Sequence, residues 1–313
     1  MNSEDIRKIV IAGAGIMGAS MAQAFALKGF NVTMYNHREI TLEKAKNRIT
    51  GAVETLVENG EIAEEQAEKA LESIKYTASE ECFRDFDLLV ESIVENADIK
   101  KDFYRTVSGL AKEGAIIATN TSALPITDLQ EAVKAPERFL GMHWFNPPNL
   151  IPLIEIIRGD KTGDDAVNAV YGISEKIGKK PVVVKKDVKG FAANRIQLAV
   201  LREALHLVEN DVISIEDLDK VIKYGIGPRY AFLGPFEVVD LGGLDTFHSI
   251  GKGLFPDLCN ASEVSPLLSE LVDSGHFGVK AQKGFYDYGE GKDAEAIKRR
   301  DEILLKLSKI LFE

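Results

Sequence analysis

Short apolar runs alternate with charged, helix-prone stretches over the first part of the chain. Near-continuous apolar runs are typical of strands that are buried on both faces, and the charged stretches between them are typical of covering helices. The pattern predicts a doubly wound α/β fold with a largely parallel sheet. The predicted strands are 7–12, 31–35, 87–91, 115–119, 139–144, 153–157 and 181–184, and the predicted helices are 39–58, 64–72, 96–112 and 164–176.

The pattern changes after residue 186. Long helical periods cover 191–209 and 215–224, and Ser214 is placed to cap the second of them, with Asp217 three residues further on. Strand signals are scarce until the Gly-rich aromatic segment 284–288, and a charged helix is expected over 294–311. We therefore expect two domains, an α/β domain over 1–186 and a smaller all-helical domain over 187–313. The apolar helices of the second domain are expected to pack on the first domain and on a partner subunit.

A glycine-rich turn follows the first predicted strand. The residues Gly13, Ala14, Gly15, Ile16, Met17 and Gly18 separate this strand from an apolar helical stretch over 19–28. A G-x-G-x-x-G turn between a strand and a helix predicts a dinucleotide site. Gly13 permits the tight turn, Gly15 lets the backbone approach a pyrophosphate, and Gly18 lets the helix pack against the strand. The free N–H groups at the start of the helix can then hold the phosphates.

The same segment has a second reading. Residues 9–27 carry no charge and follow Arg7 and Lys8, as in a signal peptide or a membrane span. Three glycines within six positions and the polar Gln23 argue against a span. With the turn assigned to a dinucleotide site, no targeting pattern is left, and we expect a cytoplasmic protein without a membrane partner.

Composition narrows the choice of partners. Of the 313 residues, 45% are hydrophobic and 28% are charged, which is typical of a globular protein. A net charge of −11 argues against a nucleic-acid partner, because phosphates require a basic surface. Cys82 and Cys259 are the only cysteines and belong to no C-x-x-C pair, so neither a disulfide framework nor a metal site is expected.

Two ionisable residues interrupt apolar strands. Glu155 lies within 153–157 and His143 lies within 139–144. A buried carboxylate needs a cation or a hydrogen-bond donor, and a His–carboxylate pair would satisfy both residues and create a general base. The alternative is a core histidine with other partners and an edge-strand glutamate. The residues alone leave both readings open.

Further polar residues are expected beside the same cleft. Asn120, Thr121 and Ser122 follow the strand 115–119, and ligands of open parallel sheets bind beyond the carboxyl ends of strands. Asn194 lies near the start of the first helix of the second domain. The alternative roles are helix capping for Thr121 or Ser122, and a cap or surface position for Asn194.

These segments together resemble the L-3-hydroxyacyl-CoA dehydrogenase family. The resemblance covers nearly the whole chain, in the order and close to the spacing of the family. It rests on the blocks 13–18, 90–96, 120–122, 143–147, Glu155, 190–195, 234–237 and 284–286.

The resemblance implies an NAD(P)-dependent oxidoreductase with a dinucleotide-binding domain, a helical dimerisation domain and a homodimeric state. It implies that His143 is the general base, that Glu155 orients it, and that Ser122 and Asn194 bind the reacting oxygen of a 3-hydroxy substrate. The hydride would pass from C3 to the nicotinamide. The positions that match cofactor contacts of the family are Gly13 to Gly18, Glu95, Lys100, Asn120 and Asn146.

One departure concerns the cofactor. The second strand of an NAD enzyme normally ends in Asp or Glu, which binds the ribose 2′-hydroxyl. Here the position is Asn36, followed by His37 and Arg38. Asn can still bind a hydroxyl, whereas Arg38 can pair with a 2′-phosphate. NAD and NADP are both possible cofactors, with NAD slightly favoured.

Another departure concerns the substrate. The segment 53–61 is acidic where acyl-CoA enzymes often carry lysines, and Pro152 replaces a family lysine. The segment 227–235 is similar to the L-gulonate 3-dehydrogenase (lambda-crystallin) branch, in which the substrate is a free 3-hydroxy acid. Arg229 would then clamp a carboxylate, or else form a structural salt bridge.

The segment 284–286, in contrast, is like that of the 3-hydroxybutyryl-CoA enzymes. We expect hydride transfer at C3 of a small 3-hydroxy acid, with a slight preference for the free acid over the CoA thioester. A catalytically silent dinucleotide-binding protein is the alternative of another class, and a methyltransferase on a similar fold is a third.

Overall fold

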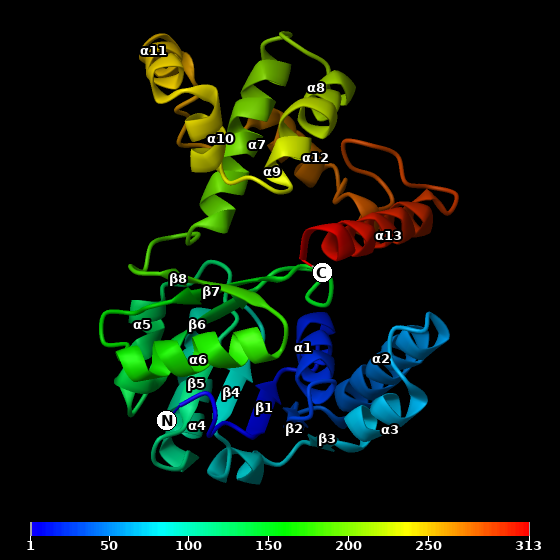
Figure 1. Cartoon of the computed structure of the whole chain (residues 1–313), viewed down its shortest axis with the longest axis vertical. Helices are drawn as coiled ribbons and strands as arrows, with labels where there is room; N and C mark the ends of the chain where they lie inside the picture. Colours follow the sequence, from blue (N-terminus) through cyan, green and yellow to red (C-terminus); the bar gives the residue numbers. More distant parts are fainter. Residues whose placement is uncertain (1, 313) are drawn as a thin grey trace. The chain divides into compact units, whose positions relative to one another are not determined.

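The computed structural model describes residues 2–312, which form two compact units (Figure 1). The first unit ends at Asn194 and the second begins at Arg195, later than the predicted boundary after residue 186. The backbone of Ala192 and Ala193 and the side chain of Asn194 form hydrogen bonds within the first unit, and these bonds hold the segment there.

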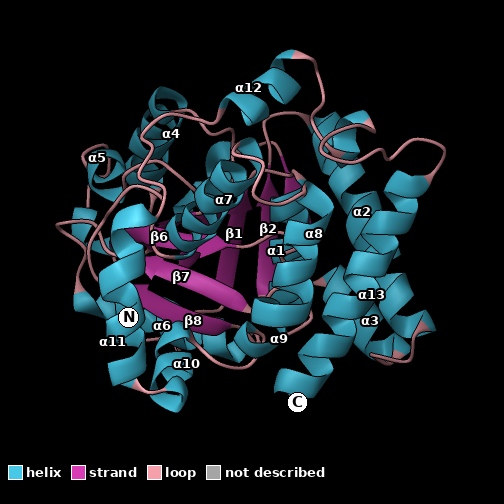
Figure 2. Ribbon diagram, turned by 90° about the horizontal axis from the view of Figure 1, so that it is seen from above, coloured by secondary structure: helices cyan, strands magenta, loops and turns pink. Residues whose placement is uncertain are grey.

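A single eight-stranded sheet lies at the centre of the first unit (Figure 2). Its order is β3-β2-β1-β4-β5-β6-β7-β8, and every neighbouring pair is parallel except β6 and β7. The predicted, largely parallel sheet is confirmed. The strands are β1 (Lys8–Ala12), β2 (Asn31–Tyr35), β3 (Ile74–Thr77), β4 (Leu88–Glu91), β5 (Ile116–Thr119), β6 (Phe139–Trp144), β7 (Leu153–Ile157) and β8 (Lys180–Val184).

Helices cover both faces of this sheet. Side chains alternate along β1, so that Ile9 and Ile11 join one hydrophobic cluster and Val10 and Ala12 the other. The first cluster is closed by α1 (Ile16–Ala26), α2 (Glu39–Glu58), α3 (Glu64–Glu72) and α6 (Asp164–Lys176). The second is closed by α4 (Ala97–Leu110), α5 (Ile126–Gln130) and the 3-10 turn η1 (Glu80–Arg84).

The edge strand β3 is absent from the predicted elements. Its four residues, Ile-Lys-Tyr-Thr, mix apolar and polar side chains, and only Ile74 is buried. Such a short edge strand gives no clear apolar run, and its assignment depends on pairing with β2.

The second unit is helical. Ser214 caps α8 as predicted, because its Oγ accepts a hydrogen bond from the Asp217 N–H at 3.1 Å. In the segment 284–288, Asp287 forms an isolated bridge with Lys283, which also pairs with Gly278. No helix within residues 2–312 is long and apolar enough to cross a membrane. The helices are α7 (Ala193–Glu209), α8 (Ile215–Val221), α9 (Gly227–Tyr230), α10 (Pro235–Gly242), α11 (Leu244–Leu254), α12 (Pro266–Asp273) and α13 (Lys292–Phe312).

Candidate active site

The glycine turn lies between β1 and α1. A Cβ atom on Gly13, where φ is 111°, would lie 2.3 Å from the Ser92 carbonyl oxygen. A Cβ atom on Gly18 would lie 1.9 Å from the Gly13 carbonyl oxygen. In contrast, a Cβ atom on Gly15 would meet nothing within 4 Å. Packing therefore requires the outer two glycines, whereas the middle one faces open space.

The start of α1 suits an anion. Its N-cap residue, Gly15, makes no side-chain capping bond, and the first turn carries no acidic residue. The first amide N–H groups of a helix have no partner within the helix, and the helix dipole makes this end positive. Ile16 is 62% exposed and Met17 is half-buried. The open space at Gly15 and these amides fit the pyrophosphate of a dinucleotide.

His143 and Glu155 face each other across the antiparallel pair β6 and β7. The His143 Nδ1 atom lies 2.9 Å from Glu155 Oε2, and both side chains are buried. Because an ionised carboxylate only accepts hydrogen bonds, Nδ1 carries a proton and Nε2 presents its lone pair. The predicted pair is therefore present, with the tautomer that a general base requires.

The start of α7 holds the other Glu155 oxygen. Oε1 accepts hydrogen bonds from the N–H groups of Ala192 at 3.0 Å and Ala193 at 2.9 Å. Burial alone raises the pKa of Glu155, but the hydrogen bonds from His143, Ala193 and Ala192 outweigh it and lower the pKa below 4.5. Glu155 is thus held as a carboxylate.

The backbone ahead of α7 takes an uncommon conformation. Gly190 and Phe191 have φ values of 75° and 51°, and the buried Phe191 ring lies 5.6 Å from the His143 ring. Left-handed backbone at a non-glycine residue is uncommon and clusters at functional sites. Here it precedes the two N–H groups that bind Glu155.

Ser122 and Asn194 meet on the free side of His143. The Ser122 Oγ atom lies 3.2 Å from His143 Nε2, and Ser122 is exposed. The Asn194 amide donates to the Ser122 carbonyl oxygen at 3.1 Å. The structure therefore brings together the four residues that were predicted to be catalytic, His143, Glu155, Ser122 and Asn194, although they come from four segments of the chain.

The sequence did not predict a buried charged cluster that lies behind Ser122. Glu91 is fully buried at the end of β4, and its carboxylate accepts from Lys100 Nζ at 2.6 Å, Thr119 Oγ1 at 2.8 Å and the Tyr104 hydroxyl. The signal that could have revealed it is a Glu ending the apolar run 87–91.

Lys100 joins this cluster to Ser122 by way of Glu95. Its Nζ lies 3.2 Å from Glu95 Oε2, while Glu95 Oε1 accepts from the Ser122 N–H at 3.0 Å and from the Thr121 hydroxyl. Lys100 is 1% exposed and its ammonium is bound by two carboxylates. The contacts of Glu95 and Lys100 with the cofactor stay predictions.

Two asparagines mark the ends of β5 and β6. The Asn120 side-chain oxygen accepts from the Trp144 N–H at 2.8 Å and so joins the two strand ends. Asn146 is exposed and precedes a cis peptide bond to Pro147. Their cofactor contacts also stay predictions.

Lys179 supports the loop that follows Asn146. Its Nζ donates to the carbonyl oxygens of Pro148 and of Ile151, the latter at 2.8 Å, and lies 5.1 Å from the Trp144 ring centroid. Burial lowers the pKa of this amine to about 8. Sequence analysis missed this residue, because a single lysine before a strand carries no pattern.

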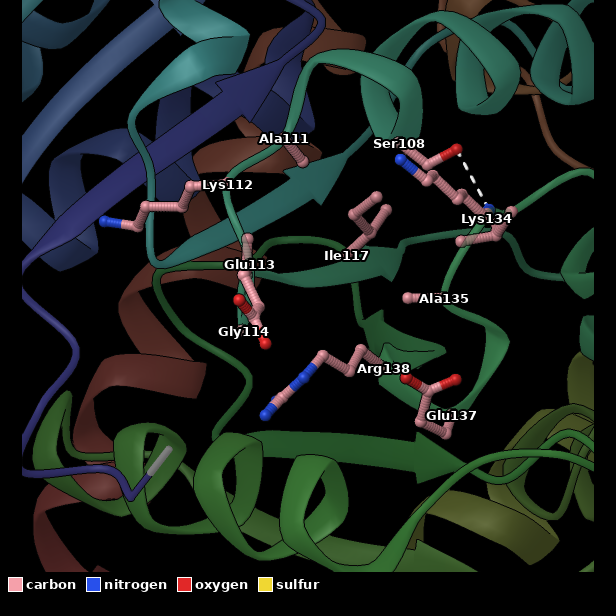
Figure 3. Close-up of a pocket in the computed structure, with 12 residues that line it drawn as sticks. Ser108, Ala111, Lys112, Glu113, Gly114, Ile117, Lys134, Ala135, Glu137 and Arg138 are labelled. Carbon is pink, nitrogen blue, oxygen red and sulfur yellow. Dashed lines mark hydrogen bonds between the residues drawn. The ribbon is translucent and has the colours of Figure 1, made fainter.

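Arg229 and a separate pocket do not belong to the group of residues around His143. Arg229 lies in α9 of the second unit and is exposed, so its role as a carboxylate clamp stays a prediction. A pocket of about 440 Å³ lies near the amino ends of β5 and β6 (Figure 3), whereas the glycine turn and Ser122 follow the carboxyl ends of β1 and β5. Its lining includes Ser108, Lys112, Ile117, Lys134, Glu137 and Arg138, and none of the predicted site residues.

Comparison with known proteins agrees with this geometry. Residues 8–188 match the model of the NAD binding domain of 3-hydroxyacyl-CoA dehydrogenase, and residues 190–288 match that of its C-terminal domain. The 5-formyl-3-hydroxy-2-methylpyridine 4-carboxylate 5-dehydrogenase of Mesorhizobium japonicum is 40% identical, over 90% of this chain and 91% of that protein. A probable 3-hydroxybutyryl-CoA dehydrogenase of Deinococcus radiodurans is 37% identical, over 90% of this chain and 100% of its own.

Solved structures with a similar fold include dehydrogenases of the same kind. A crystal structure described as a 5-formyl-3-hydroxy-2-methylpyridine 4-carboxylic acid 5-dehydrogenase, an NAD⁺-dependent dismutase, has a TM-score of 0.90 at 38% identity, covering 98% of both chains. The (S)-3-hydroxybutyryl-CoA dehydrogenase of Ralstonia eutropha has a TM-score of 0.78 at 33% identity, covering 91% of this chain and 100% of that one. The chain is an NAD(P)-dependent oxidoreductase, with NAD favoured. It belongs to the 3-hydroxyacyl-CoA dehydrogenase family.

Proposed function

We propose that this oxidoreductase interconverts a hydroxyl and a carbonyl group at C3 of a small free 3-hydroxy acid, with His143 as the general base. The observation that carries the proposal is the hydrogen-bonded series Glu155–His143–Ser122, with distances of 2.9 Å and 3.2 Å. A general base must lie within hydrogen-bond reach of the proton that it takes. His143 Nε2 meets this condition for a hydroxyl bound at Ser122.

The residues divide the work as follows. His143 Nε2 takes the proton of the C3 hydroxyl, and the Glu155 carboxylate stabilises the imidazolium that forms. The Ser122 hydroxyl and the Asn194 amide hold the reacting oxygen. The bound nicotinamide supplies the acceptor for the hydride from C3. The start of α1 holds the pyrophosphate.

The charge around α2 and α3 supports a substrate without a CoA phosphate. Six glutamates over 54–68 are exposed, with no lysine or arginine among those fifteen positions. Negative charge on a surface repels a phosphate group. The relative from Mesorhizobium japonicum is named for a pyridine carboxylate rather than a CoA thioester. The six exposed glutamates of this chain are Glu54, Glu58, Glu61, Glu64, Glu65 and Glu68.

The alternative is a 3-hydroxyacyl-CoA dehydrogenase. The relatives from Deinococcus radiodurans and Ralstonia eutropha are named for 3-hydroxybutyryl-CoA, and both family models carry the CoA name. The reacting residues are the same for both substrates. The choice therefore depends on what binds the remainder of the substrate, a carboxylate or a CoA chain.

The rate of NADH and NADPH oxidation with acetoacetyl-CoA and with a panel of free 3-keto acids tests the proposal. We expect turnover of a free keto acid, with a loss of about tenfold or more in Arg229→Met, since one charge-assisted hydrogen bond is removed. Arg299→Met, which removes an exposed arginine from α13, serves as the matched control. Fast turnover of acetoacetyl-CoA alone would establish the alternative and contradict the carboxylate role of Arg229.

His143→Ala tests the mechanism in the same assay. We expect kcat to fall by about 10²- to 10⁴-fold, the usual contribution of a general base, while the Kd of NADH changes by less than about twofold. Turnover at the native rate would show that another group takes the proton. If the native protein turns over no substrate of the panel and still binds NADH, the chain is a silent dinucleotide-binding protein.

We also propose that the protein works as a homodimer in the cytoplasm. Within the described part of the second unit, residues 195–312, only Leu205 and Gly251 are buried. Large exposed apolar surfaces mark protein interfaces, so the second unit supports contact with a second copy. Cys82 and Cys259 are both free, which is consistent with a reducing compartment.

A further inference from the structure

The residue that follows β2 is Asn36, whereas an NAD site normally has Asp or Glu at this position. Ala12 pairs with Tyr35, so Asn36 follows the strand beside the glycine turn. A carboxylate at this position accepts hydrogen bonds from ribose hydroxyls and repels a 2′-phosphate. Asn36 is neutral, and it removes this repulsion without removing the capacity for hydrogen bonds.

The orientation of the Asn36 amide decides which atoms it offers. Its Oδ1 accepts a hydrogen bond from the Arg38 N–H at 2.9 Å, so the amide oxygen is held against the backbone. Within residues 2–312 the Nδ2 group of this half-buried side chain, with two donors, forms no hydrogen bond. Phosphate oxygens only accept hydrogen bonds, whereas a ribose hydroxyl both donates and accepts. The Nδ2 group of Asn36 can therefore donate a hydrogen bond to a 2′-phosphate or to a ribose 2′-hydroxyl.

The neighbouring charges add a cation. The Arg38 side chain is exposed, and within residues 2–312 it forms no hydrogen bond or ion pair. Arg38 is also the N-cap of the 20-residue helix α2, whose first N–H groups receive no side-chain cap. Glu39 in the first turn of α2 and Glu80 near Tyr35 oppose an anion. The Arg38 guanidinium and the positive end of the α2 helix dipole are the two contributions that favour an anion here.

We propose that this ribose site accepts a 2′-phosphate, so that NADPH binds with a Kd within about tenfold of that of NADH. The two bound forms would share the pyrophosphate site at Gly15 and differ only at Asn36 and Arg38. The inference rests on the cofactor site of the proposed function, and it is independent of which substrate the enzyme takes.

Isothermal titration of the whole chain with NADH and NADPH, in the absence of substrate, tests this inference. For Asn36→Asp we expect the Kd of NADPH to rise by about a hundredfold, because two like charges are placed in contact, while the Kd of NADH changes little. For Arg38→Ala we expect a rise of about tenfold for NADPH only. The affinity for NADPH should also fall more steeply with salt than that for NADH.

Arg48→Ala is the matched control. It removes the same charge from an exposed position further along α2, beyond roughly one Debye length from the helix start, so neither Kd should change. Tight NADH binding with a Kd for NADPH more than tenfold weaker in the native protein would overturn the inference and leave the oxidoreductase proposal standing. So would an unchanged ratio of the two values in Asn36→Asp. Failure of both nucleotides to bind would contradict the cofactor site itself.

Discussion

At the scale of single residues, His143 and Glu155 show how two side chains unsuited to a core become stable there. Each one alone would leave a buried polar group without a partner, which costs about 1–3 kcal/mol or more. In the structure both carboxylate oxygens of Glu155 have hydrogen-bond donors. Oε2 lies 2.9 Å from His143 Nδ1, and Oε1 accepts from the Ala192 and Ala193 N–H groups. The residues left the pair as one of two readings and the family resemblance implied it, but neither predicted the helix start that completes it.

Glu155→Gln tests this arrangement. The variant cannot both accept from His143 and keep two backbone donors with its single oxygen, so kcat should fall by about 10²-fold or more. The native fold lowers the pKa of Glu155, so its carboxylate stabilises the protein above pH 4.5 and loses this effect as the pH falls through the lowered pKa. The difference in free energy of unfolding between the two proteins should therefore become smaller as the pH falls below 4.5. A difference that grows on acidification would contradict this assignment.

At the scale of elements, β6, β7, α2, α3 and α6 were predicted with their observed bounds, since apolar runs and helical periods are local properties. The predicted helix 215–224 ends earlier, at Val221, where a π-helical turn over Ile222–Ile226 begins. Helices α10, α11 and α12 were not predicted; α10 and α12 begin at proline and α11 follows Gly243, and both residue types are read locally as turn signals. Strand β3 depends on pairing that no local pattern reveals.

The strand–turn–helix element allows a paired test of its glycines. Gly18→Ala should lower the free energy of unfolding by about 1–3 kcal/mol, because the new Cβ atom lies 1.9 Å from the Gly13 carbonyl oxygen. Gly15→Ala meets no atom within 4 Å, so its effect on stability should stay within about 1 kcal/mol. The same variant should weaken NADH binding by about tenfold or more, since the methyl group fills the phosphate space. Denaturant unfolding and isothermal titration measure the two effects, and a Gly15→Ala variant with native affinity would exclude this turn as the phosphate site.

At the scale of the whole molecule, the second unit exposes many large apolar side chains. Phe236, Leu241 and Tyr224 are 84%, 76% and 79% exposed. We expect a dimer in sedimentation velocity, and we expect Phe236→Asp with Leu241→Asp on α10 to shift it toward the monomer, because charges in an apolar interface lose hydration. Ile40→Asp, at an exposed apolar position of α2, is the control and should leave the dimer intact. A native monomer would contradict the homodimer proposal.

The sequence by itself determined the alternation of strands and helices and the glycine turn, which depend on neighbours within a few positions of the chain. It also predicted His143, Glu155, Ser122 and Asn194 as site residues, through their resemblance to blocks of the L-3-hydroxyacyl-CoA dehydrogenase family. The tertiary structure alone decided the contacts between distant segments: the register that sets His143 opposite Glu155, and the α7 amides on Glu155. It also decided the cluster around Glu91, where Lys100 and Thr119 converge from α4 and β5. Such contacts follow from strand order and packing, which no local pattern of residues specifies.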